Sequence, residues 1–88
     1  MDNLNDSTCI ATLSKEIEAQ LLQLYGSPIV TGEDLKAALG FSSLDALRQA
    51  IARNLLPVPL FTLENRRGKY ALIKDIAAYL AKERCGQS

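Results

Sequence analysis

Apolar residues recur at helical spacing on both sides of a short break at Gly40-Phe41-Ser42. Before the break, one helical face carries Leu35, Ala38 and Leu39. After it, one face carries Leu44, Leu47, Ala50 and Ile51, and the opposite face carries Asp45, Arg48, Gln49, Ala52 and Arg53. Apolar positions three and four residues apart indicate amphipathic helices. Two short helices in close succession, each with one face to bury, predict a helix-turn-helix between Thr31 and Pro57.

Residues at the ends of these two helices support the prediction. Thr31 is the expected N-cap of the first helix, and Ser42 or Ser43 is the expected N-cap of the second. Gly40 and Asn54 suit the left-handed conformation in which many helices end. The helix pair is therefore predicted to have defined starts and stops.

A longer helix is predicted ahead of this pair. Asp6, Ser7 and Thr8 are favourable N-cap residues, and Gly26-Ser27-Pro28 supplies a helix end. The apolar stripe between them consists of Ile10, Leu13, Ile17, Leu21 and Leu24. Its spacing drifts off a strict heptad, which favours a packing face in a globular domain over a long coiled coil. Two roles are open for this helix: packing on its own domain, or dimerisation through the stripe.

A strand-like composition follows the second short helix. Leu60–Leu63 and Tyr70–Ile73 are expected to form a β-hairpin around the turn-forming segment Glu64-Asn65-Arg66-Arg67-Gly68. Ile29-Val30 is expected to be a short extended link. A last helix is predicted from Lys74 to Arg84, with an inward face made of Ile76, Ala77, Leu80 and, as a further candidate, Tyr79. Residues 85–88 are expected to form a frayed tail.

Length and composition suit a single globular domain of 88 residues, of which 48% are apolar. Charged residues interrupt every apolar run, and the acidic start leads into no signal region, so we expect a cytoplasmic protein without a membrane span. Cys9 and Cys85 are too few for a zinc site in a chain without histidine. We expect both to be reduced thiols, with a disulfide that joins the chain ends as the alternative.

The formal net charge of zero conceals an asymmetry along the chain. Up to Asp34 there are six acidic residues and one lysine, a net charge of −5. From Leu35 onward there are nine basic and four acidic residues, a net charge of +5. Because local potential decides where a polyanion docks, the second part of the chain is a candidate for nucleic-acid binding.

Groups suited to catalysis are scarce. The sequence has no histidine, no glycine-rich phosphate loop, no nucleophile elbow and no metal-ligand spacing. The carboxylates of Glu33-Asp34 are explained by the start of a helix, and Ser42-Ser43 have no base beside them. We predict a protein that is not an enzyme and that uses no metal, cofactor or small-molecule ligand.

Cations gather on the outward face of the second short helix and at the tip of the hairpin. Arginine and glutamine suit base edges in the major groove, and a basic hairpin beside such a helix suits the flanking DNA backbone or minor groove. The start of a helix can also hold a phosphate. The candidate DNA-binding residues are therefore Ser42, Ser43, Arg48, Gln49, Arg53, Arg66, Arg67 and Lys69.

The order of the motifs resembles a known group of regulators. VTGEDLKAALGF, then LRQAIARNLLPVPLF, then a hairpin that leads to IKDIAAYL, resembles the small winged-helix regulators of the MerR-like and excisionase-like group. LPVPLF and DIAAYL look most similar to the pyocin-activator type and to plasmid-related regulatory proteins. The resemblance covers about Ile29 to Lys82 and leaves out the N-terminal helix. It implies recognition-helix roles for Ser43, Arg48, Gln49 and Arg53, and wing roles for Arg66, Arg67 and Lys69.

The expected fold is mainly α with one β-hairpin. A MerR-like winged helix-turn-helix would span residues 29–84, after an N-terminal amphipathic helix in 1–28 and before a tail in 85–88. The expected function is sequence-specific binding of double-stranded DNA by a homodimer that regulates transcription in a phage, plasmid or integrative element. A recombination directionality factor and a non-enzymatic adaptor for an acidic protein are the alternatives.

Overall fold

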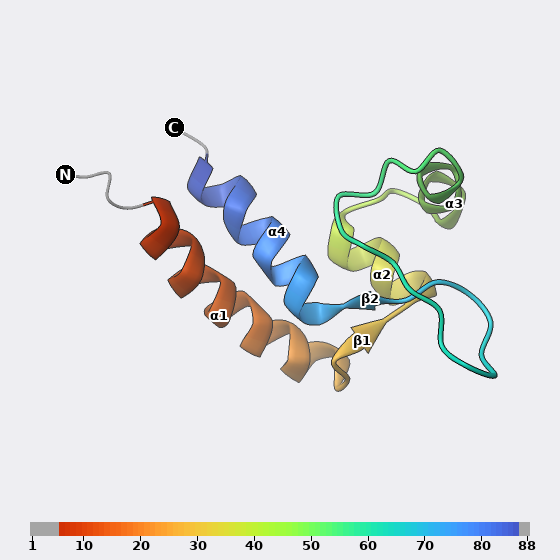
Figure 1. Ribbon diagram of the computed structural model, residues 1–88, viewed down its shortest axis with the longest axis horizontal. Helices are drawn as coiled ribbons and strands as arrows, with labels where there is room; N and C mark the ends of the chain where they lie inside the picture. The colour runs from red at the N-terminus through yellow and green to blue at the C-terminus, as the bar shows by residue number, and fades with distance from the viewer. Residues whose placement is uncertain (1–5, 87–88) are drawn as a thin grey trace.

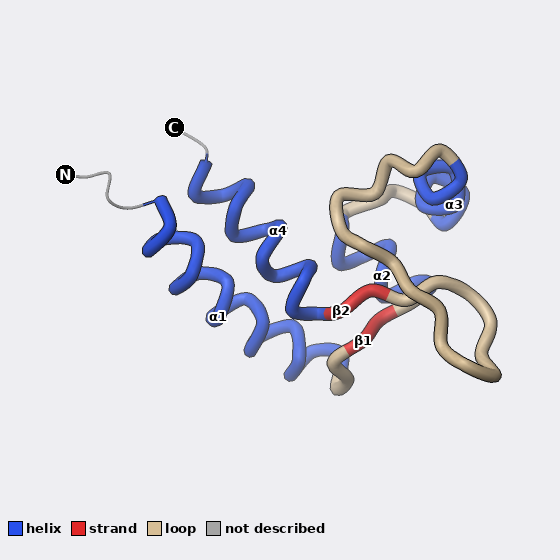
Figure 2. The backbone as a smooth tube through the Cα atoms, in the orientation of Figure 1, coloured by secondary structure: helices blue, strands red, loops and turns tan. Residues whose placement is uncertain are grey.

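The computed structural model describes residues 6–86, which form four helices and a two-stranded antiparallel sheet (Figures 1 and 2). In chain order the elements are α1 (Asp6–Tyr25), β1 (Ile29–Val30), α2 (Gly32–Leu39), α3 (Leu44–Ala52), β2 (Ala71–Leu72) and α4 (Ile73–Gly86). The mainly helical fold with a small sheet is thus confirmed. Helices α1 and α4 lie side by side at one end of the molecule, and α2, α3 and the loop that precedes β2 lie at the other (Figure 1).

The segment 70–72 is the centre of the β structure. Ala71 lies opposite Val30, and Leu72 lies opposite Ile29 in β1. Tyr70 instead exchanges two backbone hydrogen bonds with Phe61, at 2.8 and 3.0 Å. Successive residues of a strand direct their N–H and C=O groups to opposite edges. The segment 70–72 therefore bonds to Phe61 on one edge and to β1 on the other.

Most of the predicted strand pairing between Leu60–Leu63 and Tyr70–Ile73 is wrong. Leu60–Leu63 forms no strand, and its ladder with Tyr70–Ile73 is reduced to the single bridge at Phe61. Between these segments, left-handed backbone at Asn65 and Gly68 turns the chain into a loop. The partner of β2 is Ile29–Val30, which is a strand and more than a link. Ile73, expected in the hairpin, is the first residue of α4.

Helices α2 and α3 end as their sequences predict. Gly40 and Asn54 have positive φ angles of 82° and 59°. In both cases the following N–H bonds to a carbonyl five residues back: Phe41 to Lys36 and Leu55 to Ala50. This is the Schellman arrangement, which satisfies carbonyls that the end of a helix would leave free. Two short helices thereby gain fixed lengths.

The core lies where β1, α2, α3, β2 and α4 meet. Leu35 and Leu47 are buried, as the periodicity of α2 and α3 predicts. The buried hydrophobic residues are Val30, Leu35, Leu47, Val58, Ala71, Ile73, Ile76, Ala77 and Ala81. The predicted inward positions of α4 are confirmed at Ile76 and Ala77, whereas Leu80 and Tyr79 are half-buried.

Helix α1 packs on α4 of its own chain and runs in the opposite direction (Figure 1). It begins at Asp6, so Ser7 and Thr8 lie within its first turn. Its C-terminal residues Leu21, Leu22 and Tyr25 pack against the core. Of the predicted stripe, Ile10, Leu13, Ile17 and Leu21 are half-buried, and Leu24 is 70% exposed. The stripe residues other than Leu24 are thus partly covered within the chain, and dimerisation through the stripe stays a prediction.

The prediction of two free thiols is wrong, because Cys9 and Cys85 form a disulfide. Helix α4 continues to Gly86, so Cys85 lies in its last turn and not in a frayed tail; residues 87–88 of that predicted tail lie outside the described part of the chain. The antiparallel packing brings the first turn of α1 to the last turn of α4, with a Cα–Cα distance of 6.2 Å. In the chain-entropy picture, a cross-link over 76 residues lowers the entropy of the unfolded chain, which raises its free energy by about 4–5 kcal/mol at room temperature.

None of the helices between residues 6 and 86 has both the length and the apolar composition needed to cross a membrane.

A first prediction compares two leucines with opposite exposure. Leu35→Ala removes a side chain that is 1% exposed, and we expect it to lower the free energy of unfolding by about 2–5 kcal/mol. Leu24→Ala is the matched control, because that leucine is 70% exposed and its replacement should cost less than about 0.5 kcal/mol. Urea unfolding of both variants measures the difference. Equal destabilisation would show that the core lies elsewhere.

Candidate functional site

Helix α3 presents a polar face because its apolar face is anchored. Leu47 is buried, and Leu44, Ala50 and Ile51 are half-buried on the same side. The opposite face consists of exposed residues, as predicted: Asp45, Arg48, Gln49, Ala52 and Arg53. Arg53 is the C-cap residue, so the basic residues of this face extend from the first half of the helix to its end.

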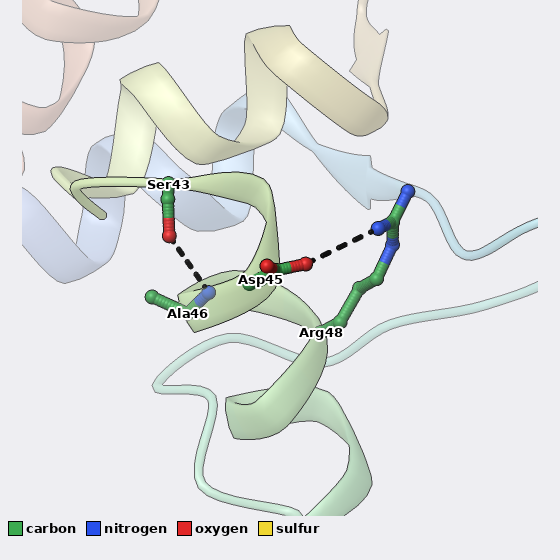
Figure 3. A network of polar contacts seen from close by, with 4 residues as sticks. All are labelled: Ser43, Asp45, Ala46 and Arg48. Atoms are coloured by element: carbon green, nitrogen blue, oxygen red, sulfur yellow. Dashed lines mark hydrogen bonds and ion pairs between the residues drawn. The ribbon is translucent and has the colours of Figure 1, made fainter.

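The start of α3 is fixed by a side-chain cap. Ser43 has extended backbone, and its Oγ accepts a hydrogen bond from the backbone N–H of Ala46 at 3.1 Å (Figure 3). Of the two serines proposed as caps, Ser43 therefore has this role. Ser42 is exposed beside it. The cap satisfies one of the N–H groups that have no partner in the first turn of a helix.

Arg48 is paired with Asp45 one turn earlier on α3. Its Nη1 lies 3.5 Å from Asp45 Oδ1, and Figure 3 shows the guanidinium extended away from the helix axis. The two side chains are 71% and 84% exposed, so the pair contributes only a few tenths of a kcal/mol to stability. Its consequence is positional: it limits the directions that the Arg48 side chain takes, and it can be displaced at little cost.

The loop 62–69 carries the second group of cations. Arg66, Arg67 and Lys69 are all exposed on it, as predicted. The base of the loop is held by the bridge between Phe61 and Tyr70, whose rings lie 6.2 Å apart. The loop is thus a cationic projection with a fixed base.

Thr31 holds this base against α2. It occupies the N-cap position of α2, as expected, but its side chain makes no capping bond. The Thr31 Oγ1 hydroxyl instead donates a 2.6 Å hydrogen bond to the carbonyl of Lys69. The predicted capping role is therefore wrong for the side chain, because a backbone acceptor 38 residues away takes the hydroxyl. No local sequence signal distinguishes these two uses of a threonine.

Arg48 from α3 and Lys69 from the loop meet at one cavity of about 260 Å³. Its lining residues are Thr31, Gly32, Leu35, Leu44, Leu47, Arg48, Ile51, Gly68 and Lys69. Of the cations predicted to face one side, the structure places Arg48 and Lys69 at this cavity. Arg53, Arg66 and Arg67 do not line this cavity; they lie farther along the helix and the loop.

The surface formed by α3 and the loop 62–69 carries more positive than negative side chains. Over α3 and the loop, five exposed cations stand against the exposed carboxylates of Asp45 and Glu64. Within residues 6–86, no group of three or more cysteine, aspartate or glutamate side chains is placed to hold a metal ion. Such a surface suits a polyanion.

Comparisons of the chain with protein-family models, with curated proteins and with solved structures found no match.

The two serines ahead of α3 provide a second prediction. Ser43→Ala removes the cap of α3, and we expect it to lower the free energy of unfolding by about 1 kcal/mol. Ser42→Ala is the matched control and should cost only a few tenths of a kcal/mol. Urea unfolding of the two variants side by side gives the comparison. A larger destabilisation by Ser42→Ala would contradict the assignment of the cap.

Proposed function

We propose that this chain is a winged helix-turn-helix protein that binds double-stranded DNA in a sequence-specific way and regulates transcription. In this proposal α2 and α3 form the helix-turn-helix, α3 enters the major groove, and the loop 62–69 is the wing. The MerR-like and excisionase-like motif order of the sequence supports the same interpretation and suggests a mobile genetic element as its setting.

The dimensions of α3 fit this role. An α-helix with its side chains is about 10–12 Å across, which fits a major groove of B-DNA about 12 Å wide, and α3 has nine residues with which to reach base edges. Its exposed face offers Arg48, which can bond to guanine through two donors, and Gln49, which can pair with adenine. The opposite face is packed on the core, so the helix has one face for DNA and one for the domain.

The observation that carries the proposal is that Arg48 and Lys69 line one cavity while the Thr31 hydroxyl bonds to the Lys69 carbonyl. These contacts relate the helix and the loop to each other before any ligand binds. A preformed relation matters because duplex DNA presents its groove and its flanking phosphates at fixed spacing. If the relative positions of the helix and the wing are already fixed, less conformational entropy is lost when the protein binds DNA.

Selection from a pool of random duplexes tests the function directly. We expect enrichment of one sequence that binds about 10³-fold or more tightly than the starting pool at physiological salt. If the chain binds as the homodimer we propose, the enriched sequence contains two inverted half-sites about one helical turn apart. Failure to enrich any sequence would contradict the proposal, and an adaptor for an acidic protein would give that result.

The wing provides the third prediction. Changing Arg66, Arg67 and Lys69 together to Ala should weaken binding to the selected duplex and to random duplex alike, because a loop tip without base contacts binds phosphates or the minor groove. The slope of log K against log salt should become shallower by about one unit for each phosphate that the variant no longer neutralises. Fluorescence anisotropy at several salt concentrations measures both effects.

A matched control for the wing variant removes the same charge from the other end of the molecule. Lys15, Lys82 and Arg84 are exposed on α1 and α4, and their joint replacement by Ala also lowers the net charge by three. We expect this control to change affinity and salt slope far less. Equal effects of the two triple variants would mean that the wing contributes only to the overall charge of the protein and makes no specific contact with DNA.

The fourth prediction assigns sequence specificity to α3. Arg48→Ala and Gln49→Ala should each cost about 1–3 kcal/mol on the selected duplex and much less on random duplex. Arg84→Ala, an exposed arginine on α4, serves as the control and should leave both affinities unchanged. Equal weakening on selected and random DNA would mean that the two residues contact the backbone, and that specificity comes from another register of the helix or from DNA shape.

A further inference from the structure

The first half of α1 is attached to the molecule differently from its second half. Leu21, Leu22 and Tyr25 pack against the core, whereas the apolar residues nearer the N-terminus are half-buried and touch no part of that core cluster. No residue of α1 whose exposure is described belongs to the buried core. The buried residues therefore come from β1, α2, α3, β2, α4 and the loop at Val58, and α1 packs along α4 with exposed and half-buried residues.

Among the side chains that the structure describes, no ion pair or side-chain hydrogen bond joins α1 to α4. The strong link at this end of the helix pair is the Cys9–Cys85 disulfide. Cys9 is exposed and Cys85 is half-buried. They lie in the first turn of α1 and in the last turn of α4, and Figure 1 shows these two helix ends far from α3.

We propose that Cys9–Cys85 is a reversible thiol–disulfide site whose redox state controls the docking of residues 8–17 of α1 on α4. Exposure of Cys9 makes the disulfide accessible to exchange. Residues 8–17 of α1 are exposed or half-buried and none of them is buried, so this segment opens more easily than the core. The oxidised form holds the first half of α1 in place. The reduced form releases it, while Leu21, Leu22 and Tyr25 keep the second half on the core.

A dithiol is the reductant we consider for this site. One thiolate of the dithiol attacks a sulfur of the disulfide, which forms a mixed disulfide and releases the other cysteine as a thiolate. The second thiol of the reductant then attacks the mixed disulfide and releases the second cysteine. In total the protein gains two electrons and two protons, and the dithiol becomes a disulfide.

Hydrogen exchange of the full chain with dithiothreitol as the dithiol tests the proposal. Alkylation and mass measurement count the thiols, and exchange is followed for residues 8–17 and for α2 and α3. We expect two thiols to appear without denaturant and residues 8–17 to exchange about tenfold or more faster, with α2 and α3 still protected. Unchanged exchange in residues 8–17 after reduction would overturn the proposal. Thiols that appear only together with unprotected amides in α2 and α3 would do so too.

A variant without the disulfide provides an independent check. Cys9→Ser with Cys85→Ser should show the fast exchange of residues 8–17 with and without dithiothreitol, and protected α2 and α3. Slow exchange in this variant would mean that packing alone holds the helix. Unprotected α2 and α3 would mean that the cross-link is needed for folding. Either result contradicts a reversible site.

Discussion

The arrangement of this protein depends on four successive residues that bond in different directions. Tyr70 bonds to Phe61 and so closes the loop 62–69. Ala71 and Leu72 pair with β1, and the N–H of Ile73 bonds to the carbonyl of Pro28 at 2.7 Å as α4 begins. The loop, the segment after α1 and the start of α4 are thereby joined within one short stretch of chain. A pair of strands this short is only marginally stable in water by itself, so β1 and β2 depend on the helices packed against them. The helices in turn are joined to one another through these strands.

The candidate DNA-binding surface follows from this junction. The loop returns to the junction at Lys69, whose carbonyl is bonded by Thr31 at the start of α2. Leu47 of α3 is buried in the same core cluster as Leu35 of α2, and Arg48 of α3 lines the same cavity as Lys69. The basic loop and α3, with Arg48 and its C-cap Arg53, therefore approach each other at the base of the loop. Arg53, Arg66 and Arg67 do not line the cavity there. Weakening the junction should affect both groups of charges together.

The features that the sequence predicts correctly are those that neighbouring residues determine. Helices α2 and α3 follow from apolar spacing, and their ends follow from Gly40 and Asn54, whose left-handed backbone is a local property. The pairing of β1 with β2, the bond from Thr31 to Lys69 and the Cys9–Cys85 disulfide join residues about 40 to 76 positions apart. Such contacts depend on the path of the whole chain. Local composition therefore suggests a hairpin, a side-chain cap and two thiols in their place.

The claim that α3 and the loop 62–69 act as one DNA-binding surface is tested most directly by NMR. Backbone amide resonances of the labelled protein would be followed while a duplex selected by the protein is added. We expect the amides of residues 44–53 and 66–69 to shift along one binding curve with a single dissociation constant, while those of residues 8–17 and 80–86 stay in place. Shifts centred on α1 and the end of α4, or shifts in α3 without the loop, would contradict this account.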